Sequence, residues 1–189
     1  MRHESNTRIK ETQEDSFCRN SDSQTKKGYL TIATGNYYHW LAKNLYNSYL
    51  LTQEEKLPFA VITDRKGQKK LYKYFDSVIE IVPTKNGFET KLNIDELSPF
   101  EKTIFIDADT LLTKDIYYWW DLFETSRESV SVFVNSWKRA GLSEPLLSEK
   151  AKKKYGLNRY LRFNGGVYYF DKSIESHAIF SRAKDVLKT

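Results

Sequence analysis

The sequence predicts an α/β domain with a mostly parallel central sheet flanked by helices. Short runs rich in β-branched and aromatic residues alternate with segments whose apolar residues recur at helical spacing. The clearest of these runs are almost continuously apolar, which is typical of strands buried on both faces of a parallel sheet. No internal repeat is visible in the 189 residues, so one layered domain is the simplest arrangement.

The first ordered elements follow a polar tail. Residues 1–27 hold almost no large apolar side chains and are expected to be flexible, whereas residues 28–189 form the expected folded domain. Residues 29–34 (YLTIAT) have the composition of a strand, and Leu41 and Leu45 then recur on one face of a helix. Residues 59–63 (FAVIT) predict the second strand, which is short and wholly apolar or β-branched.

The central elements continue the alternation. Residues 67–75 predict a basic helix, and residues 78–82 (VIEIV) predict a third strand that Pro83 ends. Residues 91–97 are expected to be helical and to lead into a buried strand at 103–106 (TIFI).

The last third contains two further strands and a helix. Residues 129–134 and 162–170 are rich in valine and aromatic residues, which favours strands. From Ile174 to the end, apolar residues recur at helical spacing and predict a terminal helix.

Charge and cysteine content limit the classes of function. The net charge is +5, and many basic residues lie in two clusters: Arg65, Lys66, Lys69, Lys70 and Lys73, and Lys150, Lys152, Lys153 and Lys154. A mild positive field suits anionic ligands, but it is far from that of a nucleic-acid binder, so no nucleic acid is expected as a partner. Each cluster is interpreted as a solvated helix face, and peripheral contact of the first with an anionic membrane is the alternative.

Other sequence features favour a cytoplasmic protein. The single cysteine, Cys18, excludes an intrachain disulfide and a zinc site made of several cysteines. No stretch approaches the roughly 18 apolar residues of a membrane span. The N-terminal segment is polar and does not have the pattern of a secretory signal.

Two carboxylates follow the buried strand at 103–106. Residues i and i+2 of an extended chain point the same way, so Asp107 and Asp109 are expected to converge on one cation. Carboxylate oxygens suit Mn²⁺ or Mg²⁺, and such an ion keeps positions open for substrate phosphates. It would stabilise the charge of a departing nucleoside diphosphate. The alternative for either aspartate is a helix N-cap or an Asx-turn.

Three segments in order resemble one known family. TKLNIDELSPFEKTIFIDADTLLTKDIYYWWDLF, YLTIATGNYY and FNGGVYYFDKS are similar to motifs of the glycogenin and lipopolysaccharide galactosyltransferase family, which is family eight of the GT-A-fold glycosyltransferases. The resemblance covers about residues 28–188. It implies a GT-A-like nucleotide-diphospho-sugar transferase fold, so that residues 28–189 would be a nucleotide-sugar-binding glycosyltransferase domain.

The resemblance also implies roles for individual residues. Asp107 and Asp109 would ligate Mn²⁺, and Lys91 would approach the diphosphate or the donor sugar. Thr34, Asn36 and Tyr37 would contact the uridine, and Asp107 and Ala108 would also contact the nucleotide sugar. Asn164 and Gly165 would shape the donor-sugar pocket. The alternatives are a surface charge for Lys91, a packing aromatic for Tyr37, and a turn with positive φ for Asn164 and Gly165.

The sequence also departs from the family pattern. Thr34 stands where some members have Asp, and Gly165 replaces the usual Ser. The family's later acidic segment and its metal-binding His are missing, so the domain is expected to be incomplete at its C-terminus or completed by a partner chain. His177 is the only His after Asp109 and is expected on a solvated helix face, while His39 is expected to cap or pack.

The expected function is transfer of a hexose from a UDP-sugar to a hydroxyl of a saccharide, lipid-linked or protein acceptor, with retention of configuration. A non-catalytic nucleotide-sugar-binding or partner subunit is the second hypothesis. The third is a HAD-type phosphatase, which also places Asp-x-Asp after an apolar strand. That family needs Thr or Val two residues after the second Asp, where this chain has Leu111.

Overall fold

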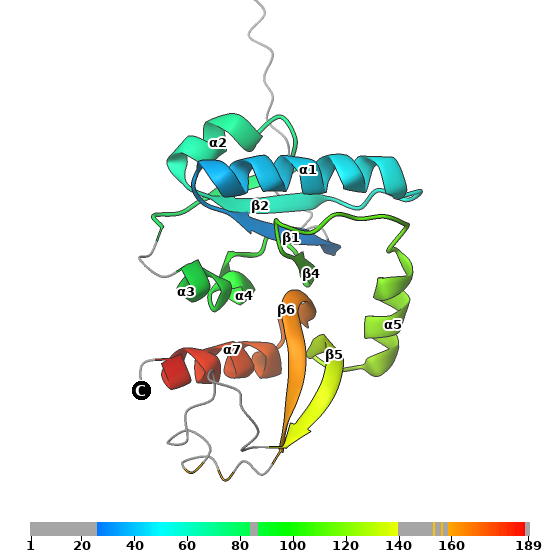
Figure 1. Cartoon of the computed structure of the whole chain (residues 1–189), viewed down its shortest axis with the longest axis vertical. Coiled ribbons are helices and arrows are strands. Elements are labelled where there is room, and N and C mark those ends of the chain that lie inside the picture. The colour runs from blue at the N-terminus through cyan, green and yellow to red at the C-terminus, as the bar shows by residue number, and fades with distance from the viewer. Residues whose placement is uncertain (1–25, 84–86, 140–152, 154–155, 157–158, 188–189) are drawn as a thin grey trace, which may run out of the picture.

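The strands and helices follow the alternation expected from the sequence (Figure 1). The computed structural model describes residues 26–83, 87–139, 153, 156 and 159–187. The strands are β1 (Lys27–Ala33), β2 (Phe59–Thr63), β3 (Ser77–Glu80), β4 (Lys102–Ile106), β5 (Val130–Arg139) and β6 (Arg159–Asp171). The helices are α1 (Asn36–Thr52), α2 (Arg65–Leu71), α3 (Gly87–Lys91), α4 (Ile94–Leu97), α5 (Tyr118–Ser126) and α7 (Ile174–Leu187).

These strands form one sheet in the order β3-β2-β1-β4-β6-β5. β1 pairs in parallel with β2 and β4, and β2 pairs in parallel with β3. β6 runs antiparallel to both β4 and β5. The predicted α/β class and the mostly parallel sheet are therefore confirmed, with an antiparallel pair at one end.

Each central strand is apolar on both sides because both faces of the sheet are covered. In β1, Tyr29 and Ala33 pack with α1, α2 and α5, whereas Leu30 faces the opposite cluster. In β4, Ile104 and Phe105 divide between the same two faces. The second face is covered by α4 and α7, through Ile94 and Phe180 among others. This two-sided burial explains the continuous apolar runs.

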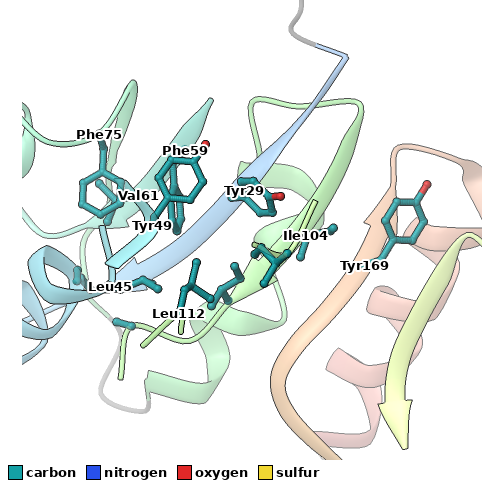
Figure 2. Packing of buried hydrophobic residues seen from close by; sticks show 14 of the residues in the cluster. Tyr29, Leu45, Tyr49, Phe59, Val61, Phe75, Ile104, Leu112 and Tyr169 are labelled. Carbon is teal, nitrogen blue, oxygen red and sulfur yellow. The ribbon is translucent and has the colours of Figure 1, made fainter. Parts of the chain in front are cut away.

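An aromatic cluster fills the first face (Figure 2). Tyr29 is wholly buried, and its ring lies 5.5 Å from Tyr49 and 5.7 Å from Phe59 between centroids. Trp120 of α5 donates a hydrogen bond from Nε1 to the Tyr29 hydroxyl at 3.0 Å, and burial raises the pKa of that hydroxyl. Tyr29 and Tyr49 thus serve as core residues beside β1, whereas Tyr37, Tyr38, Tyr72 and Tyr118 are exposed.

Several element boundaries differ from the predicted ones. The basic helix begins at Arg65 rather than Gly67 because Asp64 caps it, accepting a hydrogen bond from the Gly67 N–H at 2.8 Å. The helix predicted at 91–97 is divided: α3 begins earlier and ends at Lys91, and α4 begins at Ile94. Helix α5 is not predicted by the sequence pattern. It is short and rich in Tyr and Trp, and no side chain caps its N-terminus.

Some predictions lie outside the described residues. These are the flexible tail up to residue 25 and most of the second basic cluster, namely Lys150, Lys152 and Lys154. Lys27 belongs to β1, so the ordered chain begins slightly earlier than predicted. In the part of the chain that the structure describes, no helix combines the length and apolar character needed to cross a membrane.

Candidate functional site

The candidate site lies at the edge of the sheet where the parallel strands end. Thr34 follows β1, Asp64 follows β2 and Asp107 follows β4. Since these strands are parallel, their carboxyl ends meet at one edge, which is where ligands bind in open α/β sheets. β6 runs in the opposite direction and brings residues near Gly165 to this edge, because Val167 pairs with Ile106.

The two aspartates stand in a tight turn immediately after β4, so the extended backbone from which their convergence was predicted is not present there. Asp107 is partly exposed, and its carbonyl accepts a hydrogen bond from the Thr110 N–H at 3.1 Å. Ala108 between them is 4% exposed and packs in the core, so only its backbone is available to a ligand. Asp109 is exposed and forms no ion pair within the described residues. Because the Ala108 side chain packs in the core, the carboxylates on either side of it are held at the surface.

Lys91 reaches the first aspartate from the end of α3. Its Nζ lies 2.5 Å from Asp107 Oδ1, and both side chains are 27% exposed. The same ammonium lies 5.3 Å from the centre of the Phe105 ring, which supports it from the sheet side. The break between α3 and α4 leaves Lys91 at a helix end. The alternative of an isolated surface charge does not fit this ion pair, whereas the predicted approach of Lys91 to the diphosphate or the donor sugar stays a prediction.

Asn164 and Gly165 lie beside the aspartates in an irregular part of β6. Between the pairs Val132–Tyr168 and Val134–Phe163, the ladder of β5 and β6 is interrupted at residues 164–167. On its other side β6 continues its antiparallel pairing with β4, and the Gly166 carbonyl accepts a hydrogen bond from the Asp107 N–H at 2.8 Å. Gly165 is exposed and does not have a positive φ, so the alternative of a turn is wrong. The Asn164 side chain lies outside the described part.

The turn between β1 and α1 holds the predicted uridine-contacting residues. Thr34 is half-buried, and Asn36 begins α1 with its Oδ1 accepting a hydrogen bond from Lys70 Nζ at 2.8 Å. Tyr37 is 66% exposed, and its ring contacts that of Tyr38 edge to face. The alternative of a packing aromatic does not fit a side chain so exposed. The Tyr37 face is free for stacking on a planar ligand.

Asp64 holds this turn in place, although it was not predicted from the sequence as a site residue. Its Oδ2 accepts a hydrogen bond from the Gly35 N–H at 2.6 Å, where Gly35 has a φ of 83°. Burial raises the pKa of Asp64, but backbone N–H donors from Gly35 and Gly67 outweigh burial and hold it below its usual value. The signal in the sequence was an Asp at the end of β2, ahead of a basic helix. Asp64 thus ties the ends of β1 and β2 together.

His39 in α1 and His177 in α7 each lie beside a carboxylate. His39 is 1% exposed, with Nε2 lying 3.2 Å from Asp64 Oδ2, so the prediction that it packs is confirmed. His177 is 43% exposed, in keeping with the predicted solvated helix face, but its contact with a carboxylate was not predicted. Its Nδ1 lies 2.7 Å from Oδ2 of the buried Asp95, because α7 packs against α4. Neither histidine belongs to the Asp107 site.

The donor set at this edge is compatible with a hard divalent cation. Mn²⁺ and Mg²⁺ take carboxylate oxygens and accept one or two protein carboxylates when substrate phosphates supply other ligands. Asp107 already attracts a cation, the ammonium of Lys91, and Asp109 is exposed beside it. Among the described residues, no group of three or more His, Cys, Asp or Glu side chains forms a more complete metal site. Whether Asp107 and Asp109 share a cation is therefore a matter for the proposal below.

Comparison with known proteins identifies the fold. No protein-family model and no curated protein sequence matches the chain. Among solved structures, the bifunctional glycosyltransferase WbbM is similar with a TM-score of 0.59 at 13% identity, over 90% of this chain and 36% of that one. The galactosyltransferase LgtC, solved with donor and acceptor sugar analogues, gives a TM-score of 0.57 at 16% identity, over 85% and 63%.

A third similar structure is the glycosyltransferase GlyE of Streptococcus pneumoniae TIGR4. It has a TM-score of 0.55 at 14% identity, over 87% of this chain and 39% of that one. This chain therefore spans between 36% and 63% of the length of these three proteins. The expected resemblance is confirmed in three dimensions: the chain has the GT-A-like α/β fold of nucleotide-sugar glycosyltransferases.

Proposed function

We propose that the chain is the donor-binding part of a metal-dependent glycosyltransferase that uses a UDP-sugar. The observation that carries this proposal is the meeting of Lys91, Asp107 and the Gly166 carbonyl at the carboxyl edge of the sheet. A cationic side chain and a carboxylate pair at this edge are the groups that a diphosphate with a divalent cation requires.

Each residue of the site has a distinct task in this proposal. Asp107 and Asp109 would hold the cation, which supplies Lewis-acid stabilisation of the departing diphosphate. Lys91 would contribute a mobile point charge, since a lysine ammonium on a flexible stem can exchange a carboxylate for a phosphate. Its 27% exposure leaves room for that exchange. Charge developing on the leaving group would thus face the positive side chain of Lys91.

The β1–α1 turn would hold the nucleoside. The exposed Tyr37 ring offers a stacking face for uracil, and Thr34 and Asn36 offer polar groups beside it. Asp64 holds this turn in place through the Gly35 N–H. The Gly165 surface is open toward the described residues, since a Cβ added there would meet none of their atoms within 4 Å. That space suits a donor sugar beside Asp107.

The reaction proposed is transfer of a hexose to a hydroxyl of a saccharide, lipid-linked or protein acceptor, with retention of configuration. It is tested by incubating the protein with Mn²⁺ and a panel of UDP-hexoses and measuring UDP release. We expect slow release with one donor, lost in Asp109→Asn, and anomer analysis by NMR would then report the stereochemistry. Release that is equal in wild type and Asp109→Asn would reject the proposal.

A non-catalytic nucleotide-sugar-binding or partner subunit is the second candidate. It is favoured because, among the described residues, no group of three or more His, Cys, Asp or Glu side chains comes together as a complete metal site. The two candidates differ in one result. Metal-dependent UDP binding without release of UDP from any donor, with or without added acceptor sugars, identifies a binding subunit.

A further inference from the structure

Helix α1 turns an uncharged stripe away from the sheet. Trp40, Asn44, Asn47 and Leu51 recur every three or four residues and so share one face. The opposite face holds the buried residues of the helix, which pack on β1 and β2. Trp40 is 59% exposed and Leu51 is 86% exposed. Among the residues of α1, Lys43 is the only lysine or arginine, and there is no carboxylate.

A strongly basic helix flanks this stripe. In α2, Gly67 and Leu71 are buried, which turns the exposed Lys66 and Lys69 toward the solvent on the other side, and the exposed Lys73 follows in the turn after α2. Neither α1 nor α2 contains an Asp or Glu within its bounds. The uncharged stripe and the lysines therefore form an exposed surface without acidic residues in either helix, called here the α1–α2 surface.

Two side-chain contacts fix α2 along the edge of α1. Lys70 Nζ donates a hydrogen bond to Asn36 Oδ1 at 2.8 Å, and Lys43 Nζ lies 5.1 Å from the centre of the Tyr74 ring. Figure 1 shows the two helices side by side above the same strands. The uncharged stripe and the lysines are thus held in a constant relation, as a docking surface requires.

We propose that the α1–α2 surface docks on an anionic membrane. Trp rings with a polar edge settle at the depth of lipid headgroups, and a leucine beside them adds apolar area. Lysines next to such a stripe are attracted by the negative surface of anionic lipids. Two copies of this chain meeting through the surface would bring like charges together, which disfavours a homodimer. This proposal does not depend on the glycosyltransferase proposal.

The test measures binding of the full chain to sedimented vesicles. Vesicles of phosphatidylcholine alone are compared with vesicles in which phosphatidylglycerol makes up about one third of the lipid. We expect binding only to the second kind, weakening as salt rises. The triple change Lys66→Gln, Lys69→Gln and Lys73→Gln should lower the partition coefficient about 100-fold, at about fivefold for each lysine.

The apolar part of the surface is tested by a matched pair of variants. Leu51→Ser combined with Trp40→Ser should reduce binding about tenfold or more. Ile174→Ser on α7 is the control, because Ile174 is 85% exposed and lies outside the α1–α2 surface. Thermal unfolding of each variant excludes loss of the fold. Equal loss in Ile174→Ser, equal binding to neutral vesicles, or dimers that Trp40→Ser dissociates would each overturn the proposal.

Discussion

Lys91 and Asp107 form an ion pair at the carboxyl edge of the sheet, with 2.5 Å between Nζ and Oδ1. The pair joins the end of α3 to the turn after β4, two segments separated by the short helix α4. A lysine ammonium beside a metal-ligand carboxylate opposes the approach of a second cation. The ion pair therefore predicts competition between Lys91 and a divalent metal for Asp107.

Replacing Lys91 tests this competition. Lys91→Met keeps most of the side-chain volume and removes the charge, so Mn²⁺ should bind about fivefold more tightly in the absence of nucleotide. UDP affinity in saturating Mn²⁺ should fall, because the diphosphate loses a positive partner. Calorimetric titrations measure both. Lys102→Met is the control, since Lys102 pairs with Glu124 outside this site and should change neither affinity.

The sheet and the metal motif were predictable because each depends on local pattern. Continuous apolar runs mark β1, β2 and β4, and their burial on both faces explains that pattern. Asp107 and Asp109 follow such a run, so their position at the strand end could be predicted. The strands with weaker patterns, such as β3, had less accurate boundaries.

Long-range contacts were not predictable in the same way. Asp64 bonds to Gly35 across 29 residues, and His177 contacts Asp95 across 82. No spacing rule connects residues so distant, since tertiary packing alone brings them together. Helix α5 was missed for a related reason: its Trp120 is held by the buried hydroxyl of Tyr29, not by helix propensity.

Gly67 is a position where a methyl group should not fit. A Cβ there would overlap the Thr63 hydroxyl and lie 2.5 Å from His39 Nε2. Gly67→Ala should lower the free energy of unfolding by about 2 kcal/mol, as overpacking does. Urea denaturation measures this change. Gly165→Ala is the control, because no atom of the described residues lies within 4 Å of its Cβ position, and an equal loss in that variant would contradict the explanation.

His39 should make the fold less stable in mild acid. Burial lowers its pKa, although the nearby Asp64 carboxylate opposes that shift. As the pH falls below about 6.5, the unfolded chain takes up a proton on this imidazole while the folded chain does not. The unfolded state then binds more protons, so the free energy of unfolding decreases toward low pH.

This pH effect is measured by urea denaturation at about pH 7.5 and about pH 5.5. In His39→Gln, whose side chain does not titrate, the difference between the two pH values should be smaller than in wild type. An unchanged difference would show that other groups cause the acid sensitivity.

Asp95 should stabilise the packing of α7 on α4. Its carboxylate is 2% exposed and contacts His177, while its carbonyl accepts a hydrogen bond from Lys172 Nζ at 2.5 Å. Asp95→Ala should cost about 2 kcal/mol, less than a wholly buried pair because His177 is partly exposed. Chemical denaturation measures the loss. Glu96→Ala should change stability little, since Glu96 is 64% exposed, and equal losses would contradict this role.

The central claim is that Asp107 and Asp109 bind a divalent cation that holds a nucleoside diphosphate. Calorimetric titration of UDP into the protein, first with Mn²⁺ and then with a chelator, tests it most directly. We expect UDP to bind with micromolar affinity and to lose this binding with the chelator and in Asp109→Asn, a change at an exposed residue that leaves the fold intact. Binding that is unchanged by the chelator and by Asp109→Asn would contradict it.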